Sequence, residues 1–127
     1  MLTLPTQLAT ASAWALADYA TLQRRSVPAV GGVCQVDFDQ LDPNERWLVD
    51  HAVISCDSTT PTVLRLYDGS VDALALIDGS GSGAFDCADW PNGLAVQPTR
   101  GLIARWTGAS TGARGVVSLQ VRILRRT

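Results

Sequence analysis

Two runs of alternating side chains near the C-terminus place the strongest constraint on how this chain can fold. In the first run, Leu102, Ala104 and Trp106 alternate with Ile and Arg. In the second run, residues 117–123, every second position is Val, Leu, Val or Ile, and the positions between them carry Ser, Gln and Arg. A period of two is typical of β-strands that bury one face and expose the other. The glycine-rich segment between the runs predicts a hairpin over residues 101–124, and the upstream chain must supply the layer that covers its apolar face.

Further strand signals run through the rest of the chain. Apolar or alternating runs predict strands over residues 33–38, 47–56, 62–67, 71–78 and 94–97, with turns rich in Gly, Pro, Asp and Asn between them. Together with the hairpin these segments make about seven or eight short strands, and the chain length fits one domain. We therefore expect a mainly β fold over residues 29–127. It should be an antiparallel two-sheet sandwich, jelly-roll-like, with an immunoglobulin-like arrangement as the alternative.

The first 28 residues are predicted to form an N-terminal helix or arm. Apolar side chains recur at helical spacing from about Gln7 to Arg24, which favours a helix. Alanine-rich segments at a terminus can also be extended arms that become ordered only against a neighbouring subunit. Because the predicted sandwich is complete without this segment, its apolar side chains need something to lie against. They can cover a sheet of their own domain, or the segment can dock on a neighbouring subunit as an ordered arm, with Leu4, Leu8, Trp14 and Tyr19 at the interface.

The charges are divided unevenly along the chain. All ten basic residues are Arg, and twelve acidic residues give a net charge of −2. Six of the Arg and none of the acids lie in residues 90–127. The two parts of the chain can neutralise each other across neighbouring strands, or the acidic surface of one copy can meet an arginine-rich surface of the next. The second alternative predicts a homo-oligomer or repeated copies on a larger assembly, with contacts that include Arg114, Arg122, Arg125 and Arg126.

Residues suited to catalysis or metal binding are sparse. His51 is the only histidine, and no Ser or Cys motif accompanies it, so we expect no catalytic residues and no enzyme activity. Cys34, Cys56 and Cys87 include no CxxC pair, which predicts reduced thiols, no metal site and no cofactor. Residues 78–89, with three Gly and three Asp, are predicted to be an exposed loop. Calcium binding there, which needs roughly 6–8 oxygen ligands, is the alternative.

Composition also argues against two classes of partner. No apolar stretch reaches about 18 residues, so we expect no membrane partner. The C-terminal third is basic, but the chain is acidic overall and its Arg residues are not interleaved with aromatic residues beyond Trp106. We therefore expect no binding to nucleic acid.

Several motifs resemble one group of phage proteins. These are the segment from Trp47 to Ser55, the segment from Val63 to Gly69, the Leu76–Asp78 stretch with Gly83 and Asp86, and Leu102 with the Trp106–Ala113 stretch. Over residues 33–124 the chain resembles small β-sandwich virion structural proteins, associated with the head or tail, of tailed phages of actinobacteria. The resemblance implies a non-enzymatic minor capsid, decoration or tail protein that contacts other phage structural proteins, with an N-terminal segment that could serve as the attachment arm. It also implies localisation in the virion after assembly in the host cytoplasm.

A different class of function uses the same kind of sandwich. A carbohydrate- or receptor-binding module at a tail tip would stack aromatic rings on a host-surface glycan. The candidate rings are Trp14, Tyr67, Trp90 and Trp106, and for each of them a place in the core or in an interface is the alternative interpretation.

Overall fold

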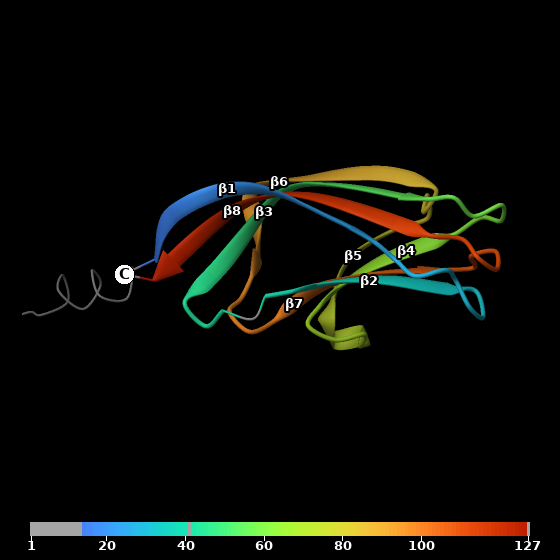
Figure 1. The fold of residues 1–127 in the computed structure, drawn as a ribbon, viewed down its shortest axis with the longest axis horizontal. Coiled ribbons are helices and arrows are strands. Elements are labelled where there is room, and N and C mark those ends of the chain that lie inside the picture. Colours follow the sequence, from blue (N-terminus) through green and yellow to red (C-terminus); the bar gives the residue numbers. More distant parts are fainter. Residues whose placement is uncertain (1–13, 41, 127) are drawn as a thin grey trace, which may run out of the picture.

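The chain folds into two stacked antiparallel sheets of four strands each (Figure 1). The structure is a computed structural model that describes residues 14–40 and 42–126. Leu4, Leu8 and residues 7–13 of the predicted helix lie outside the described residues. The strands are β1 (Trp14–Arg25), β2 (Val33–Asp39), β3 (Glu45–Cys56), β4 (Val63–Asp68), β5 (Leu76–Ser80), β6 (Phe85–Val96), β7 (Gly101–Thr107) and β8 (Gly115–Arg126), with a 3-10 turn, η1 (Ala73–Ala75), before β5.

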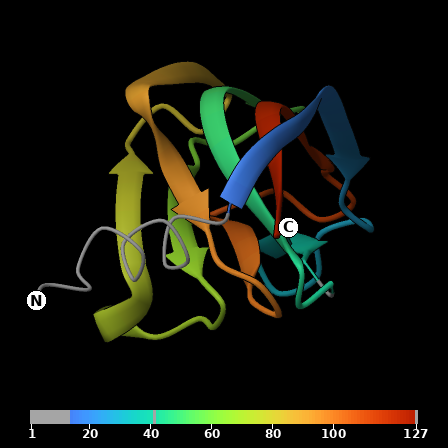
Figure 2. The same ribbon diagram turned by 90° about the vertical axis from the view of Figure 1, so that its left-hand side faces the viewer.

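The strand order establishes a jelly roll. One sheet has the order β1-β8-β3-β6 and the other β2-β7-β4-β5. The same sequence of strands across the first sheet can be followed by colour in Figure 2, from blue β1 through β8 and β3 to orange β6. Consecutive strands lie in opposite sheets, except β4 and β5, which pair with each other. This order confirms the two-sheet sandwich and the jelly-roll prediction, and it differs from the immunoglobulin-like arrangement.

The predicted C-terminal hairpin is wrong in its pairing, although both of its strands are present. β7 pairs with β2 and β4, whereas β8 pairs with β1 and β3 in the other sheet. Each strand buries one alternating face toward the space between the sheets. The loop 108–114 therefore crosses from one sheet to the other, which an alternating pattern cannot distinguish from a tight hairpin.

The helix predicted over residues 7–24 is wrong in its described part, because residues 14–25 form strand β1. β1 pairs with β8 along its whole length, with a register shift between Leu16 and Asp18. From Ala20 onward the pattern has a period of two, and Ala20 and Leu22 pack against the core while Thr21 is exposed. These residues fit helical spacing as well. The strand is favoured because it supplies hydrogen-bond partners to one side of β8.

The segment between residues 71 and 96 also differs from expectation. The strand predicted over residues 71–78 is replaced by η1 and β5, so that Val71 lies in a turn. The predicted loop over residues 78–89 is short, because β5 extends to Ser80 and β6 begins at Phe85. β6 continues through Pro91, which is tolerated because β6 is an edge strand with a register shift at this point.

The centre of the core is Trp106, which is fully buried on β7. Its indole Nε1 donates a 3.0 Å hydrogen bond to the carbonyl oxygen of Gly83, in the loop between β5 and β6. Its ring lies against the backbone of Gly115, at the start of β8, where a Cβ atom would overlap the ring. One side chain thus holds both sheets and a connecting loop in register, and its polar nitrogen is satisfied.

This contact predicts that Gly115→Ala destabilises the protein. The added methyl group would displace the Trp106 ring, and overpacking of this kind costs about 1–3 kcal/mol of unfolding free energy. Gly81→Ala is the matched control, because a Cβ atom there meets nothing within 4 Å. Urea unfolding of the two variants beside the unsubstituted chain measures the difference. Equal stability of both variants would contradict the packing described here.

Candidate functional site

The predicted interface residues of the first strand lie at one edge of the β1-β8-β3-β6 sheet. Trp14 is half-buried between two guanidinium groups, with Arg46 5.0 Å and Arg126 4.7 Å from the ring centroid. Tyr19 is 69% exposed and lies opposite Arg122 on β8. Trp14 therefore anchors the start of β1 to its own domain, and Tyr19 remains open to a partner.

Two of the predicted interface arginines are paired within the chain. The guanidinium of Arg122 donates to both carboxylate oxygens of Asp50, with the shortest bond at 2.8 Å. These hydrogen bonds, more than the surrounding charges, raise the pKa of Arg122. Arg125 lies 3.5 Å from Glu45. Both acids come from β3, so the uneven charge distribution is partly neutralised across neighbouring strands.

Of the two other predicted arginines, Arg126 stacks on Trp14, and Arg114 lies near an acid through its backbone. The amide nitrogen of Arg114 donates a 2.6 Å hydrogen bond to Oδ1 of Asp57, which ties two loops at one end of the sandwich. The structure thus places Arg114, Arg122, Arg125 and Arg126 along β8 and the loop before it. Whether they contact another copy stays a prediction.

An exposed apolar surface lies where the sequence predicted a strand. Val71, Leu74 and Leu76, which we call the β4–β5 apolar loop, are 42%, 96% and 48% exposed. The loop includes η1, which projects from the outer side of the lower sheet in Figure 1. The apolar run was visible in the sequence, but its alternation indicated burial in a sheet and did not identify a surface.

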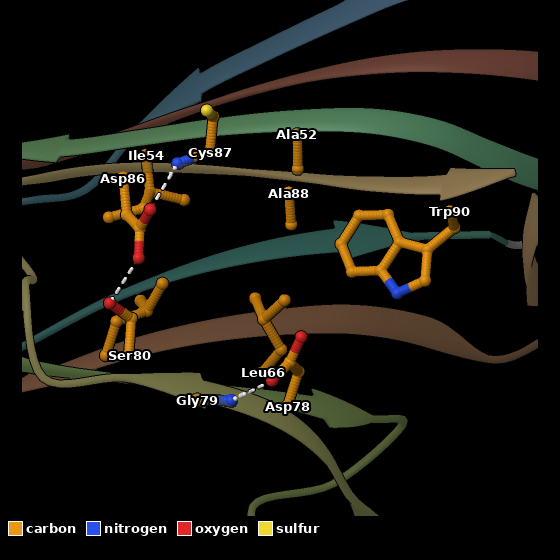
Figure 3. Close-up of a pocket in the computed structure, with 11 residues that line it drawn as sticks. Ala52, Ile54, Leu66, Asp78, Gly79, Ser80, Asp86, Cys87, Ala88 and Trp90 are labelled. Atoms are coloured by element: carbon orange, nitrogen blue, oxygen red, sulfur yellow. Dashed lines mark hydrogen bonds between the residues drawn. The ribbon is translucent and has the colours of Figure 1, made fainter.

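A second feature is a cavity of about 140 Å³ between the edge strands β5 and β6 (Figure 3). Its apolar lining comes from β3, β4 and β6, and the indole of Trp90 forms one side. Asp78 and Ser80 reach it from β5, and Asp86 reaches it from β6. The sequence identified Trp90 and the Asp-Gly segment separately, and the pairing of sheets brings them together.

The polar groups of this cavity are ordered by local hydrogen bonds. Ser80 Oγ donates a 2.5 Å bond to Asp86 Oδ2, and the amide nitrogen of Cys87 donates to Asp86 Oδ1. These bonds, led by the Ser80 hydroxyl, lower the pKa of Asp86, so its carboxylate stays charged at neutral pH. Oδ1 of Asp78 accepts from the amide of Gly79. Asp78 and Asp86 thus offer carboxylate oxygens beside an aromatic ring.

Other sequence candidates are distributed differently. Trp106 and Tyr67 are buried, so among the four candidate sugar-stacking rings Trp90 is the one that borders this cavity. Nδ1 of His51 lies 2.6 Å from Oδ1 of Asp89 on the neighbouring strand. Within the described ranges, 14–40 and 42–126, no three His, Cys, Asp or Glu side chains form a group that could hold a metal ion.

Comparisons with known proteins give distant structural neighbours. No protein-family model and no curated protein match the chain. PliG of Aeromonas hydrophila, a periplasmic inhibitor of g-type lysozyme, is 5% identical with a TM-score of 0.39, over 80% of this chain and 85% of that chain. A chain of the capsid of Helicobacter pylori bacteriophage KHP30 is 13% identical with a TM-score of 0.41, over 81% of this chain and 93% of that chain. None of the helical residues that the structure describes forms a segment long and apolar enough to cross a membrane.

The three cysteines predict a simple pattern of thiol reactivity. Burial, more than the neighbouring Cys56 thiol, raises the pKa of Cys34 from 9.0 to about 11. Cys56 is also buried, whereas Cys87 is exposed and points away from the cavity (Figure 3). We expect one thiol per folded chain to react rapidly with a disulfide reagent at pH 8, and three after denaturation.

Cys87→Ser should abolish the rapid phase, and a rapid phase that persists would contradict this assignment.

The raised pKa of Cys34 also makes the stability of the folded protein depend on pH. As the pH rises above 9.0 the unfolded Cys34 thiol ionises first, so its contribution to stability is present below that pH and is lost by about pH 11.

Proposed function

We propose that this chain is a non-enzymatic structural protein of a phage virion, which assembles in several copies on the head or tail. The resemblance to small virion proteins of tailed phages of actinobacteria motivates the proposal. The eight-stranded jelly roll is compatible with it, since viral capsid domains are among the proteins that use this architecture. Fold analogy alone does not assign a function, so the proposal depends on the surface of this chain.

The main support for the proposal is the exposure of the β4–β5 apolar loop. Leu74 is 96% exposed, and Val71 and Leu76 beside it are also exposed. A contiguous apolar surface on a folded domain indicates contact with another protein. Arg65, Asp72 and the ion pair of Arg100 with Asp68 border the adjoining grooves, and a polar rim around an apolar centre is typical of protein interfaces. We assign this surface to a contact with a neighbouring virion protein.

The earlier prediction of an attachment arm takes a narrower form. Because residues 14–25 belong to the sandwich, attachment through the N-terminal segment is proposed for residues 1–13, which include Leu4 and Leu8. Charge-complementary contacts between copies are proposed in addition.

Substitution of Leu74 tests the proposed role. Leu74→Asp places a charge at the centre of the β4–β5 apolar loop without changing the core, so we expect unchanged melting and loss of incorporation into particles. Val30→Asp is the matched control, because Val30 is 79% exposed in a different loop. Co-sedimentation of each variant with particles that lack the native protein measures incorporation. Full incorporation of Leu74→Asp would contradict the assigned surface, and an unsubstituted chain that never co-sediments would contradict the virion role.

The cavity beside Trp90 favours a second candidate function, binding of a host-surface glycan. An aromatic ring, two carboxylates and a hydroxyl are the groups that hold a sugar ring, whose faces are apolar and whose edge carries hydroxyl groups. If this function holds, Trp90→Ala should abolish binding on a glycan array and Trp90→Phe should retain part of it. An array without any bound glycan would exclude the candidate for the sugars it displays.

A further inference from the structure

We infer that two copies of this chain pair antiparallel along their β1 strands, around a two-fold axis at Thr21. The inference deepens the proposed assembly in several copies by naming one contact. It can be tested on the isolated protein, independently of any particle.

The first step is that β1 offers an open edge. Within residues 14–40 and 42–126, β1 is the terminal strand of its sheet and pairs with β8 on one side only. Figure 2 shows it at the outside of the sheet. Alternate residues of a strand direct their N–H and C=O groups to opposite sides, so about half of the twelve residues of β1 carry hydrogen-bonding groups on the open side, which a second strand can satisfy. Tyr19, 69% exposed, lies on this strand.

The second step is that the charges of β1 are complementary to themselves. Asp18, Ala20, Leu22 and Arg24 lie opposite inward-facing residues of β8, so they share the face directed toward the other sheet. Asp18 and Arg24 are too far apart to pair within one strand, at about 3.4 Å per residue. Among the described residues, neither forms an ion pair. An antiparallel copy reverses the strand, so the acidic end of one copy meets the basic end of the other.

The third step fixes the register. A two-fold axis perpendicular to the sheet keeps each face on its own side, so residues equally distant from the axis lie opposite each other. With Thr21 on the axis, Asp18 lies opposite Arg24 twice, and Ala20 lies opposite Leu22. A shift of the axis to Ala20 would place Asp18 against Leu22, and a shift to Leu22 would place it against Ser26. Of these three registers, only the one with its axis at Thr21 places Asp18, the acidic residue of the strand, opposite an arginine.

A groove beneath the same edge supports the inference. It has a volume of about 490 Å³, and Leu22, Phe38 and Trp47 are among its lining residues. The sandwich is therefore incompletely closed between β1 and β2. A second β1 strand would extend the sheet over this groove and cover part of its apolar lining.

Charge reversal on β1 provides the test, with sedimentation velocity over a wide range of concentration as the measurement. We expect the unsubstituted chain to dimerise, and Asp18→Arg or Arg24→Asp alone to weaken the dimer about tenfold or more, because each reversal makes two like-charge contacts. Both substitutions in one chain should restore dimerisation. An equimolar mixture of the two single variants should also restore it, since their strands are complementary.

Controls separate this contact from other effects. Asp37→Arg, an exposed reversal on β2 in the other sheet, should leave the dimer unchanged. Thermal melts at a concentration where every variant is monomeric should be nearly equal, because Asp18 and Arg24 are exposed and the contact from Arg24 inside its own chain is a 5.8 Å approach to the Phe38 ring centroid. A chain that stays monomeric, or a dimer that neither single reversal weakens, would overturn the inference. A monomer that still co-sediments with particles would overturn it while leaving the virion role intact.

Discussion

The hydrogen bonding of β8 on both sides is the interaction on which the rest of the structure depends. β8 lies between β1 and β3, and its inward side chains, Val117, Leu119 and Val121, are buried in the core. It reaches this position because the preceding loop crosses from β7, where Trp106 packs against the backbone at the start of β8. The pairing draws residues 14–25 into the sheet and sets the edge that β1 presents to other molecules.

A two-residue period in the sequence shows which residues of a strand face the core, and this decides how much of the fold could be predicted. Apolar or alternating runs located β2, β3, β4, β7 and β8 closely, because each of these strands buries a face in the core. Such runs carry no information about the partner of a strand, so β7 and β8 were paired with each other although they lie in different sheets. In β1 and β6, edge positions tolerate polar residues and proline, and the strand signal was correspondingly weak.

The candidate site was predictable only in its parts. The charge imbalance was visible in the sequence, but which arginines are neutralised depends on register, as the bonds from Arg122 to Asp50 show. The cavity at Trp90 needs the edges of both sheets, which no local pattern describes. The exposure of Leu74 arises because a 3-10 turn replaces the expected strand there. In each case the residues were present in the sequence, and tertiary pairing decided whether they became surface, cavity or ion pair.

The account requires above all that residues 14–25 form a strand of the sheet and not a detachable helix. Amide hydrogen exchange of the isolated protein tests this directly on β8. In an antiparallel sheet, alternate amides of a central strand point to its two neighbours, here β1 and β3. We predict strong protection of both sets of β8 amides. If the set that points toward β1 exchanged as fast as an unstructured peptide while the other set stayed protected, the N-terminal segment would lie outside the sheet, and both the jelly roll and the open β1 edge would be contradicted.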